Sequence, residues 1–139
     1  MKFQYDLLRI LDLLVDSVFK ENHRVYGSHR NRLHCADDFS ISVQMGRFNY
    51  CRPRVSGIPA ARYYSAELGY PSENEDLIRD YSNDPGQDPR HSIYSLVPME
   101  IVKEMFIAHG GLHPAEVIRL KKIEKQLAIK PNYTEGKRI

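Results

Sequence analysis

The stretch FSISVQMGRFNYCRPR, residues 39–54, predicts the first β-strand of the fold and the surface that follows it. Apolar and polar residues alternate over residues 39–45, and this period of two is typical of a half-buried strand. At Gly46 the alternation changes phase, and a glycine at such a point predicts a β-bulge, because glycine tolerates positive φ. Pro53 has no N–H to donate, so it ends the strand pairing.

Residues 62–70 alternate in the same way and predict an antiparallel partner for this strand. Their alternation puts Tyr64 with Ala66 and Leu68 on one face of the strand and Tyr63 on the other. The connection between the two strands is longer than a two-residue turn, so the sequence does not specify their register.

Apolar periodicity and capping residues predict the remaining elements. Helices are expected over 2–22, 72–81, 98–109 and 114–129, a third strand over 93–97, and loops over 23–38 and 82–92. Ser72 and Glu75 form a capping-box pattern, and residues 109–112 form the pattern of a Schellman stop. The predicted class is α+β, with a small three-stranded, mainly antiparallel sheet packed against helices in the order α-β-β-α-β-α-α. We expect one globular domain over 1–129 and a flexible tail over 130–139.

The net charge of +2 is too small to indicate a nucleic-acid-binding protein by itself, but it is unevenly distributed. No carboxylate occurs between Arg47 and Arg62, whereas six fall within residues 73–88. Residues 22–36 form a second acid-free basic segment, which is expected to be a solvated loop or to extend the first basic segment. The charge is therefore patterned rather than large.

Membrane and disulfide classes are disfavoured by the sequence. The chain has no apolar run of about 18 residues, and acidic residues interrupt the apolar ones near the N-terminus as no signal peptide would allow. Two cysteines, Cys35 and Cys51, are too few for a disulfide framework. We therefore expect a soluble cytoplasmic protein with reduced thiols and no membrane partner.

The acid-free block around the two strands is the candidate ligand-binding site. Its residues are Arg47, Phe48, Tyr50, Arg52, Arg54, Arg62 and Tyr63. Guanidinium groups bind phosphate oxygens through two parallel hydrogen bonds, and aromatic faces stack on bases. The alternative is that the aromatic residues are ordinary half-buried strand residues and the arginines a solvated edge.

The sequence indicates neither a cofactor nor a metal site. It contains no phosphate-binding glycine motif, and the spacing of its histidines and cysteines matches no zinc pattern. His109 and His113 are four residues apart, but Gly110, Gly111 and Pro114 break the helix between them. No catalytic residue is predicted, and a protein without enzymatic activity is favoured.

Three segments resemble small proteins of phage and prophage origin: FNYCRPR (48–54), YYSAELGYPS (63–72) and IYSLVPMEIVKEMFIAHGG (93–111). The similarity covers residues 39–112. That group has no assigned function, so the resemblance implies no catalytic residues. It implies an accessory phage protein acting in the host cytoplasm, where many such proteins counter host defence by binding a nucleic-acid-guided effector or a nucleotide signal.

The leading hypothesis is a non-catalytic protein that binds a phosphate-bearing ligand, either a nucleotide signal or a nucleic acid. The first alternative is an anti-CRISPR-like inhibitor that contacts a host defence complex through the acidic segment 73–88 or the first helix. The second is a small cysteine-dependent enzyme in which Arg52 and Arg54 lower the pKa of Cys51. The apolar faces of the first and last helices suit a homo-oligomer as well as a monomer core.

Overall fold

The computed structural model describes residues 6–15 and 29–138, with side chains up to residue 127. The expected helix over 2–22 and the expected loop over 23–38 therefore lie partly outside the described residues. The class is α+β: helices and strands follow one another along the chain, and neighbouring strands pair antiparallel.

The sheet has four strands in chain order. They are β1 Leu33–His34, β2 Ser40–Gln44, β3 Ser65–Gly69 and β4 Ile93–Pro98. Val43 lies opposite Leu68 in the β2–β3 pair, and Leu68 lies opposite Tyr94 in the β3–β4 pair. β2, β3 and β4 are the strands expected near residues 39–45, 62–70 and 93–97, and the antiparallel pairing of the first two is confirmed.

The expectation of three strands is wrong because β1 lies within residues 23–38, where a loop is predicted. Leu33 pairs with Ile41 and is completely buried. A strand of two residues is too short to show alternation in the sequence. Its position follows from the tight turn that comes next, in which the Cys35 N–H donates to the Phe39 carbonyl at 2.8 Å.

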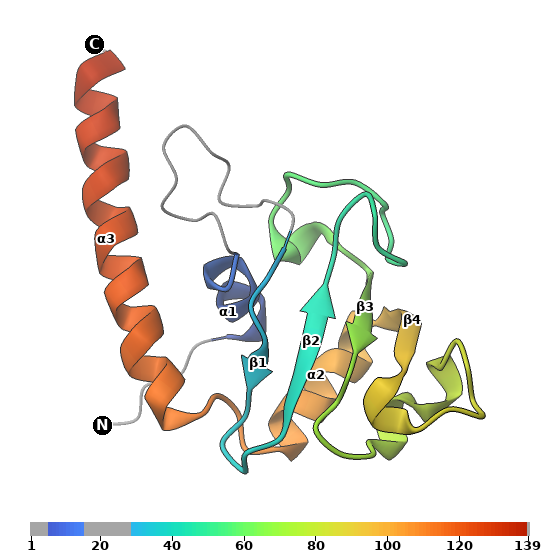
Figure 1. The fold of residues 1–139 in the computed structure, drawn as a ribbon. Coiled ribbons are helices and arrows are strands. Elements are labelled where there is room, and N and C mark those ends of the chain that lie inside the picture. The colour runs from blue at the N-terminus through green and yellow to red at the C-terminus, as the bar shows by residue number, and fades with distance from the viewer. Residues whose placement is uncertain (1–5, 16–28, 139) are drawn as a thin grey trace.

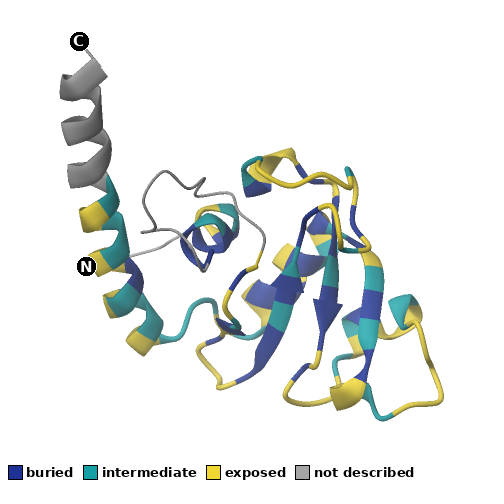
Figure 2. Ribbon diagram, turned by 45° about the horizontal axis from the view of Figure 1, so that its top comes forward, coloured by how far each residue is buried: buried dark blue, intermediate teal, exposed yellow. Residues whose placement is uncertain are grey.

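Helices cover one side of the sheet and its β1 edge. The α-helices are α1 Leu7–Leu13, α2 Met99–Ala108 and α3 Pro114–Arg138, and the connections contain the short 3₁₀ helices η1 Ala60–Arg62, η2 Asp76–Tyr81 and η3 Pro89–His91. In Figure 1, α2 lies behind the sheet, and α1 and α3 lie beyond β1. Leu11 of α1, Met105 of α2 and Val97 of β4 are completely buried in the shared core. Figure 2 shows the buried residues concentrated in β2, β3 and α1.

α1 is shorter than the helix expected over 2–22. It starts after Asp6, whose carboxylate caps it, and has seven residues. Val15 then forms an isolated antiparallel bridge with Arg30. A helix that continues through Val15 is therefore excluded, because this bridge needs extended backbone. The apolar period still favours helix at this position, so the sequence pattern does not show the break.

η2 begins later than the capping-box pattern predicts. The Ser72 Oγ accepts a hydrogen bond from the Ser40 N–H at 2.9 Å, which ties the chain to β2. The residue that caps η2 is Glu75, which accepts from the Leu77 N–H at 3.0 Å. A short helix is present as expected, but its capping box is not, because the sheet already uses the Ser72 hydroxyl.

The end of α2 is the Schellman stop that residues 109–112 predict. The Gly111 N–H donates to the Phe106 carbonyl and the Gly110 N–H to the Ile107 carbonyl, both at 3.0 Å. The φ angles of these glycines are +80° and +88°, a region that residues with a side chain rarely adopt.

α3 is longer than expected. It begins at Pro114 as predicted, and Leu120 is completely buried. The helix continues to Arg138, past residue 129 where the sequence pattern predicts its end.

Replacing Gly110 with alanine is expected to lower the free energy of unfolding by about 2 kcal/mol. Roughly half of this loss comes from the left-handed φ angle. The rest comes from crowding, because the added Cβ would lie 3.1 Å from the Ala36 Cβ. Urea unfolding followed by circular dichroism measures the loss.

Gly111→Ala is the matched control for this variant. Gly111 also has a left-handed φ, but a Cβ there would meet nothing within 4 Å. We expect a loss of about 1 kcal/mol. Equal losses in the two variants would contradict a role for the Ala36 contact.

Candidate functional site

The loop that follows β2 is built around a buried cysteine. The chain turns at Gly46, whose carbonyl accepts from the Asn49 N–H at 3.0 Å. The Cys51 Sγ lies inside this turn, 3.3 Å from both the Gly46 nitrogen and the Gly46 oxygen. Gly46 therefore opens a turn after the strand has ended, and it does not form the expected bulge within the strand.

Backbone hydrogen bonds connect this loop to β3 and β4. The Leu96 N–H donates to the Tyr50 carbonyl at 3.0 Å, and the Tyr64 N–H donates to the Arg52 carbonyl at 2.7 Å. Arg52 also forms an isolated bridge with Ser65. The loop thus crosses the end of the sheet, at the upper end of β2 in Figure 1.

Three aromatic side chains project from this end of the sheet. Phe48 is 79% exposed, Tyr64 is 76% exposed and Tyr50 is 49% exposed. Tyr63, by contrast, is 4% exposed, and its hydroxyl donates to the Val55 carbonyl at 2.5 Å. Tyr63 therefore belongs to the core, and the expectation that it forms part of the binding site is wrong in this respect. Its neighbour Tyr64 is exposed in its place.

This exchange has a local cause. η1 runs directly up to Arg62, and Tyr63 is its C-terminal cap, with its N–H bonded to the Ala60 carbonyl at 3.2 Å. β3 starts only at Ser65. The alternation of β3 therefore does not extend back to the tyrosine pair, which is why strand parity fails to give their directions.

Two of the arginines lie over the exposed rings. The guanidinium carbon of Arg47 is 4.9 Å from the centroid of the Phe48 ring, and that of Arg54 is 5.1 Å from the centroid of Tyr50. Such cation–π contacts orient both partners without neutralising the charge. The arginines thus remain available to an anion.

Six of the seven residues predicted for the site are exposed, and Tyr63 is the one that is buried. We call the exposed set the Arg/aromatic surface; it consists of Arg47, Phe48, Tyr50, Arg52, Arg54, Arg62 and Tyr64. The nearest carboxylate along β3, that of Glu67, accepts a hydrogen bond from the Asn49 side chain at 2.6 Å.

The arginines of this surface differ from the other arginines whose side chains the structure describes. Four arginines elsewhere each pair with a carboxylate: Arg9 with Glu124, Arg79 with Asp76, Arg90 with Asp88 and Arg119 with Glu116. Within the described ranges, the four arginines of the surface form no ion pair. Four positive charges are thus exposed and uncompensated in one region.

A buried arginine binds the backbone at the start of the loop that follows β2. Arg30 is 1% exposed, and it donates from Nε to the Leu11 carbonyl at 2.9 Å and from Nη1 to the Met45 carbonyl at 3.1 Å. Arg32 bonds the Ser40 hydroxyl at 2.8 Å. Arg30 and Arg32 are therefore bonded to the protein itself, and the expectation that they belong to a solvated basic loop is wrong. Residues 22–28 lie outside the described part of the chain.

The two cysteines do not have the surroundings of reactive thiols. Cys51 is completely buried, and burial raises the pKa of its thiol despite the nearby Gly46 N–H. Burial also raises the pKa of Cys35, to about 12. A thiolate nucleophile is therefore not available at either position at neutral pH.

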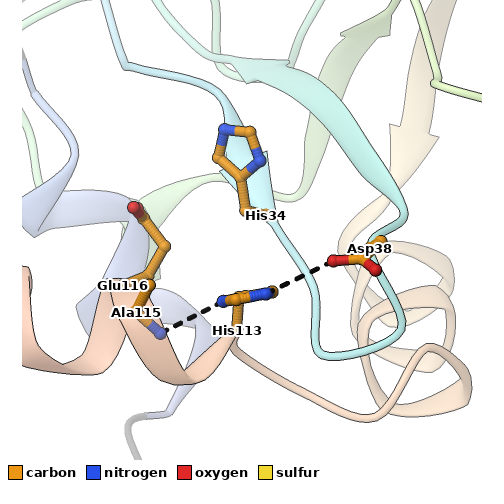
Figure 3. Close-up of a pocket in the computed structure, with 5 residues that line it drawn as sticks. All are labelled: His34, Asp38, His113, Ala115 and Glu116. Atoms are coloured by element: carbon orange, nitrogen blue, oxygen red, sulfur yellow. Dashed lines mark hydrogen bonds and ion pairs between the residues drawn. The ribbon is translucent and has the colours of Figure 1, made fainter.

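A shallow pocket lies at the opposite end of β2, and Figure 3 shows its lining. His113 accepts from the Ala115 N–H at 3.1 Å, and its Nε2 lies 3.3 Å from the Asp38 carboxylate. The carboxylate of Glu116 is paired with Arg119 at 2.8 Å. Three side chains of the lining, those of Asp38, His113 and Glu116, thus already have a hydrogen-bond or ion-pair partner. Among the described residues, no group of three or more His, Cys, Asp or Glu could hold a metal ion.

His109 connects three segments that are distant in the sequence. Its Nδ1 lies 2.6 Å from an Asp37 oxygen and its Nε2 lies 2.5 Å from a Glu75 oxygen. Its ring stacks on Phe39 with 3.9 Å between centroids. Both ring nitrogens can donate only in the imidazolium, so the pair of carboxylates favours the protonated form. Nothing in the sequence pattern indicates this arrangement.

The fold and the surface define an α+β protein with an exposed arginine and aromatic surface at one end of a four-stranded antiparallel sheet. Searches against family models, curated proteins and solved structures find no match to the chain. In the described part of the chain, no helix has the length and apolar character needed to cross a membrane.

Proposed function

We propose that the protein is a non-catalytic binding protein for a phosphate-bearing ligand, which it holds on the Arg/aromatic surface. The observation that supports this is the contrast between paired and unpaired arginines. Elsewhere in the described part of the chain, the arginine guanidinium groups are bonded to a carboxylate or a carbonyl, whereas the four arginines of the surface are exposed and form no ion pair.

Phosphate matches this chemistry better than a carboxylate or a neutral ligand does. A guanidinium presents a planar set of donors that fits two phosphate oxygens, and a group of arginines suits a ligand with several phosphate charges. The exposed rings beside the arginines add a stacking surface, which a nucleotide base can use.

The resemblance of residues 39–112 to phage and prophage proteins gives this proposal its biological setting. An accessory protein that binds a nucleotide signal or a nucleic acid in the host cell would act by sequestering it. We therefore propose counter-defence as the role of the binding activity.

The double variant Arg52→Ala/Arg54→Ala is expected to bind a fluorescein-labelled oligonucleotide of about 12 nucleotides at least tenfold more weakly than the wild type. Both side chains are exposed, so the fold should persist. Fluorescence anisotropy at several salt concentrations gives the affinity. The slope of log K against log salt should become less steep by about 1.4 for a single strand.

The control variant is Arg79→Ala/Arg90→Ala, which removes the same charge from two exposed, acid-paired arginines. It should retain wild-type affinity within about twofold, because neither arginine belongs to the Arg/aromatic surface, and the loss of exposed ion pairs has little effect on the fold. Wild-type protein that binds neither the oligonucleotide nor ATP nor a cyclic dinucleotide would refute the proposal.

A protein partner is the second candidate, and the apolar residues beside the arginines favour it. Val55 is 43% exposed and follows Arg54 in the chain, and Leu96 is 39% exposed and bonded through its N–H to the Tyr50 carbonyl. Aromatic residues with arginines are also typical of the energetic centre of a protein interface. Co-purification of a host complex that resists nuclease treatment would support this function, and that of an anti-CRISPR-like inhibitor in particular.

A further inference from the structure

The Arg/aromatic surface contains more stacking surface than one nucleotide can use. Phe48 and Tyr64 are more than three-quarters exposed and Tyr50 is 49% exposed. The three rings come from two segments of the chain. A single base covers one ring. Three exposed rings therefore indicate a ligand with several bases.

Backbone hydrogen bonds join the two segments that carry the rings. The Tyr50 carbonyl accepts from the Leu96 N–H of β4, and the Arg52 carbonyl accepts from the Tyr64 N–H beside β3. Tyr64 is thus bonded through its backbone to the segment that carries Phe48, Tyr50 and three of the arginines. A nucleic-acid strand presents both bases and phosphates to such a combination of rings and guanidinium groups.

The cation–π contacts make the rings suitable for stacking. Arg47 lies over Phe48 and Arg54 over Tyr50, yet Phe48 remains 79% exposed. A guanidinium on one side holds the ring in place and leaves its other side open to a base. Tyr64 has no such partner among the described residues and is open at 76% exposure.

A duplex would leave these rings without a function. Paired bases are stacked on one another inside a double helix, so only the phosphates of a duplex can reach a surface of this type. Unpaired bases can turn outward and stack on aromatic side chains. The combination of unpaired arginines with exposed rings therefore favours single strands.

We propose, building on the proposed function, that the ligand is single-stranded nucleic acid, whose bases stack on Phe48, Tyr50 and Tyr64 while its phosphates contact the surrounding arginines. Stacking is tolerant of base identity, and the surface therefore recognises unpaired strands with little sequence specificity. The arginines provide affinity for any phosphate polymer, and the rings provide the preference for unpaired strands.

The test uses fluorescence anisotropy of the full chain with three probes: oligo-dT and oligo-U of about 12 nucleotides, and a DNA duplex of equal length. The variant Phe48→Ala/Tyr64→Ala removes two exposed rings and leaves all arginines in place. We expect it to bind both single strands roughly tenfold more weakly and the duplex with nearly unchanged affinity.

Tyr70→Ala is the matched control, because Tyr70 is 48% exposed and follows β3 at the end opposite Tyr64. It should bind oligo-dT as the wild type does. The relative affinities for oligo-dT and oligo-U show whether DNA or RNA is preferred, and either order supports the inference.

The outcomes separate this inference from the proposed function. If binding depends on Arg52 and Arg54 but is equal for duplex and single strand, and the ring variant binds normally, the single-strand inference is wrong and the proposed function stands. If wild-type protein binds a mononucleotide as tightly as oligo-dT, the inference is also wrong. Absence of binding to every phosphate ligand overturns both.

Discussion

Arg30→Met should lower the free energy of unfolding by about 3 kcal/mol, the largest loss that we expect from a single substitution. Arg30 is 1% exposed and donates to the carbonyls of Leu11 and Met45. Methionine has similar length but no donor, so two buried carbonyl groups would lose their partners. Each loss of this kind costs about 1 to 3 kcal/mol.

The same contacts explain why the expected loss is not larger. No described residue accepts a hydrogen bond from Arg30 Nη2, so part of the cost of burying the guanidinium is uncompensated in the folded protein. Burial lowers the pKa of Arg30 and outweighs the electrostatic contributions of Tyr63 and Asp12, which favour the charged form. Removing the group therefore also removes an unfavourable contribution.

Chemical unfolding in urea measures this prediction, with Arg9→Met as the control. Arg9 forms an exposed ion pair with Glu124 at 3.1 Å, and its loss should cost less than about 1 kcal/mol. A loss below 1 kcal/mol in Arg30→Met would show that the buried hydrogen bonds do not stabilise the junction between α1 and the loop after β2. In that case the support that we assign to the Arg/aromatic surface would also be absent.

Stability is expected to fall as the pH rises from about 6 to about 9, by on the order of 1 to 2 kcal/mol, because His109 loses its proton. Burial lowers the pKa of His109, but the hydrogen bonds to Glu75 and Asp37 outweigh it, and the pKa lies above its ordinary value of 6.5. A group with a raised pKa in the folded state stabilises the protein fully below its unfolded pKa. This contribution is lost as the pH rises through the folded pKa.

On the acid side the sign is reversed. The hydrogen bond from His109 lowers the pKa of Asp37 below its ordinary value of 3.8. A lowered carboxylate pKa stabilises the protein above the unfolded value, and the contribution is lost as the pH falls through the folded value. The cluster should therefore stabilise most between about pH 4 and pH 6.5. Cys35, which also faces these carboxylates, stays protonated throughout, since its pKa is about 12.

The variant His109→Gln isolates this effect from other titrating groups. It should be less stable than the wild type near pH 6 and should lose little further stability up to pH 9. His113→Gln is the matched control, because His113 lies 3.3 Å from one carboxylate and is more exposed. The wild-type pH dependence should persist in that control. A His109→Gln protein with the wild-type slope between pH 6.5 and 9 would contradict the assignment.

The local sequence predicts those parts of the fold in which neighbouring residues interact. Phe39, Ile41, Val43 and Met45 alternate, and all four are buried in or beside β2. The glycine pair after α2 forms the expected Schellman stop, since its hydrogen bonds join residues within one turn. The unbalanced arginines of residues 47–62 were evident as well, because an acid-free run needs no tertiary information.

The direction of Tyr63 and Tyr64 has a local cause that the sequence pattern did not show, because η1 directly precedes the pair and has no strong sequence pattern. Other features depend on contacts between separate segments of the chain. β1 is a strand because Leu33 pairs with Ile41 of β2. α1 ends just before the antiparallel bridge between Val15 and Arg30. In each case the pairing partner lies outside the window in which periodicity operates.

By itself, the sequence determined the α+β class, three of the strands, the end of α2 and the absence of acids from residues 47–62, because alternation, capping and charge are properties of adjacent residues. Only the tertiary structure decided which arginines are buried and which are exposed. It also brought His109 to Asp37, 72 residues away. The physical reason is that burial and ion pairing depend on which distant segments meet, and the free energy of those contacts is not encoded in any single stretch of the chain.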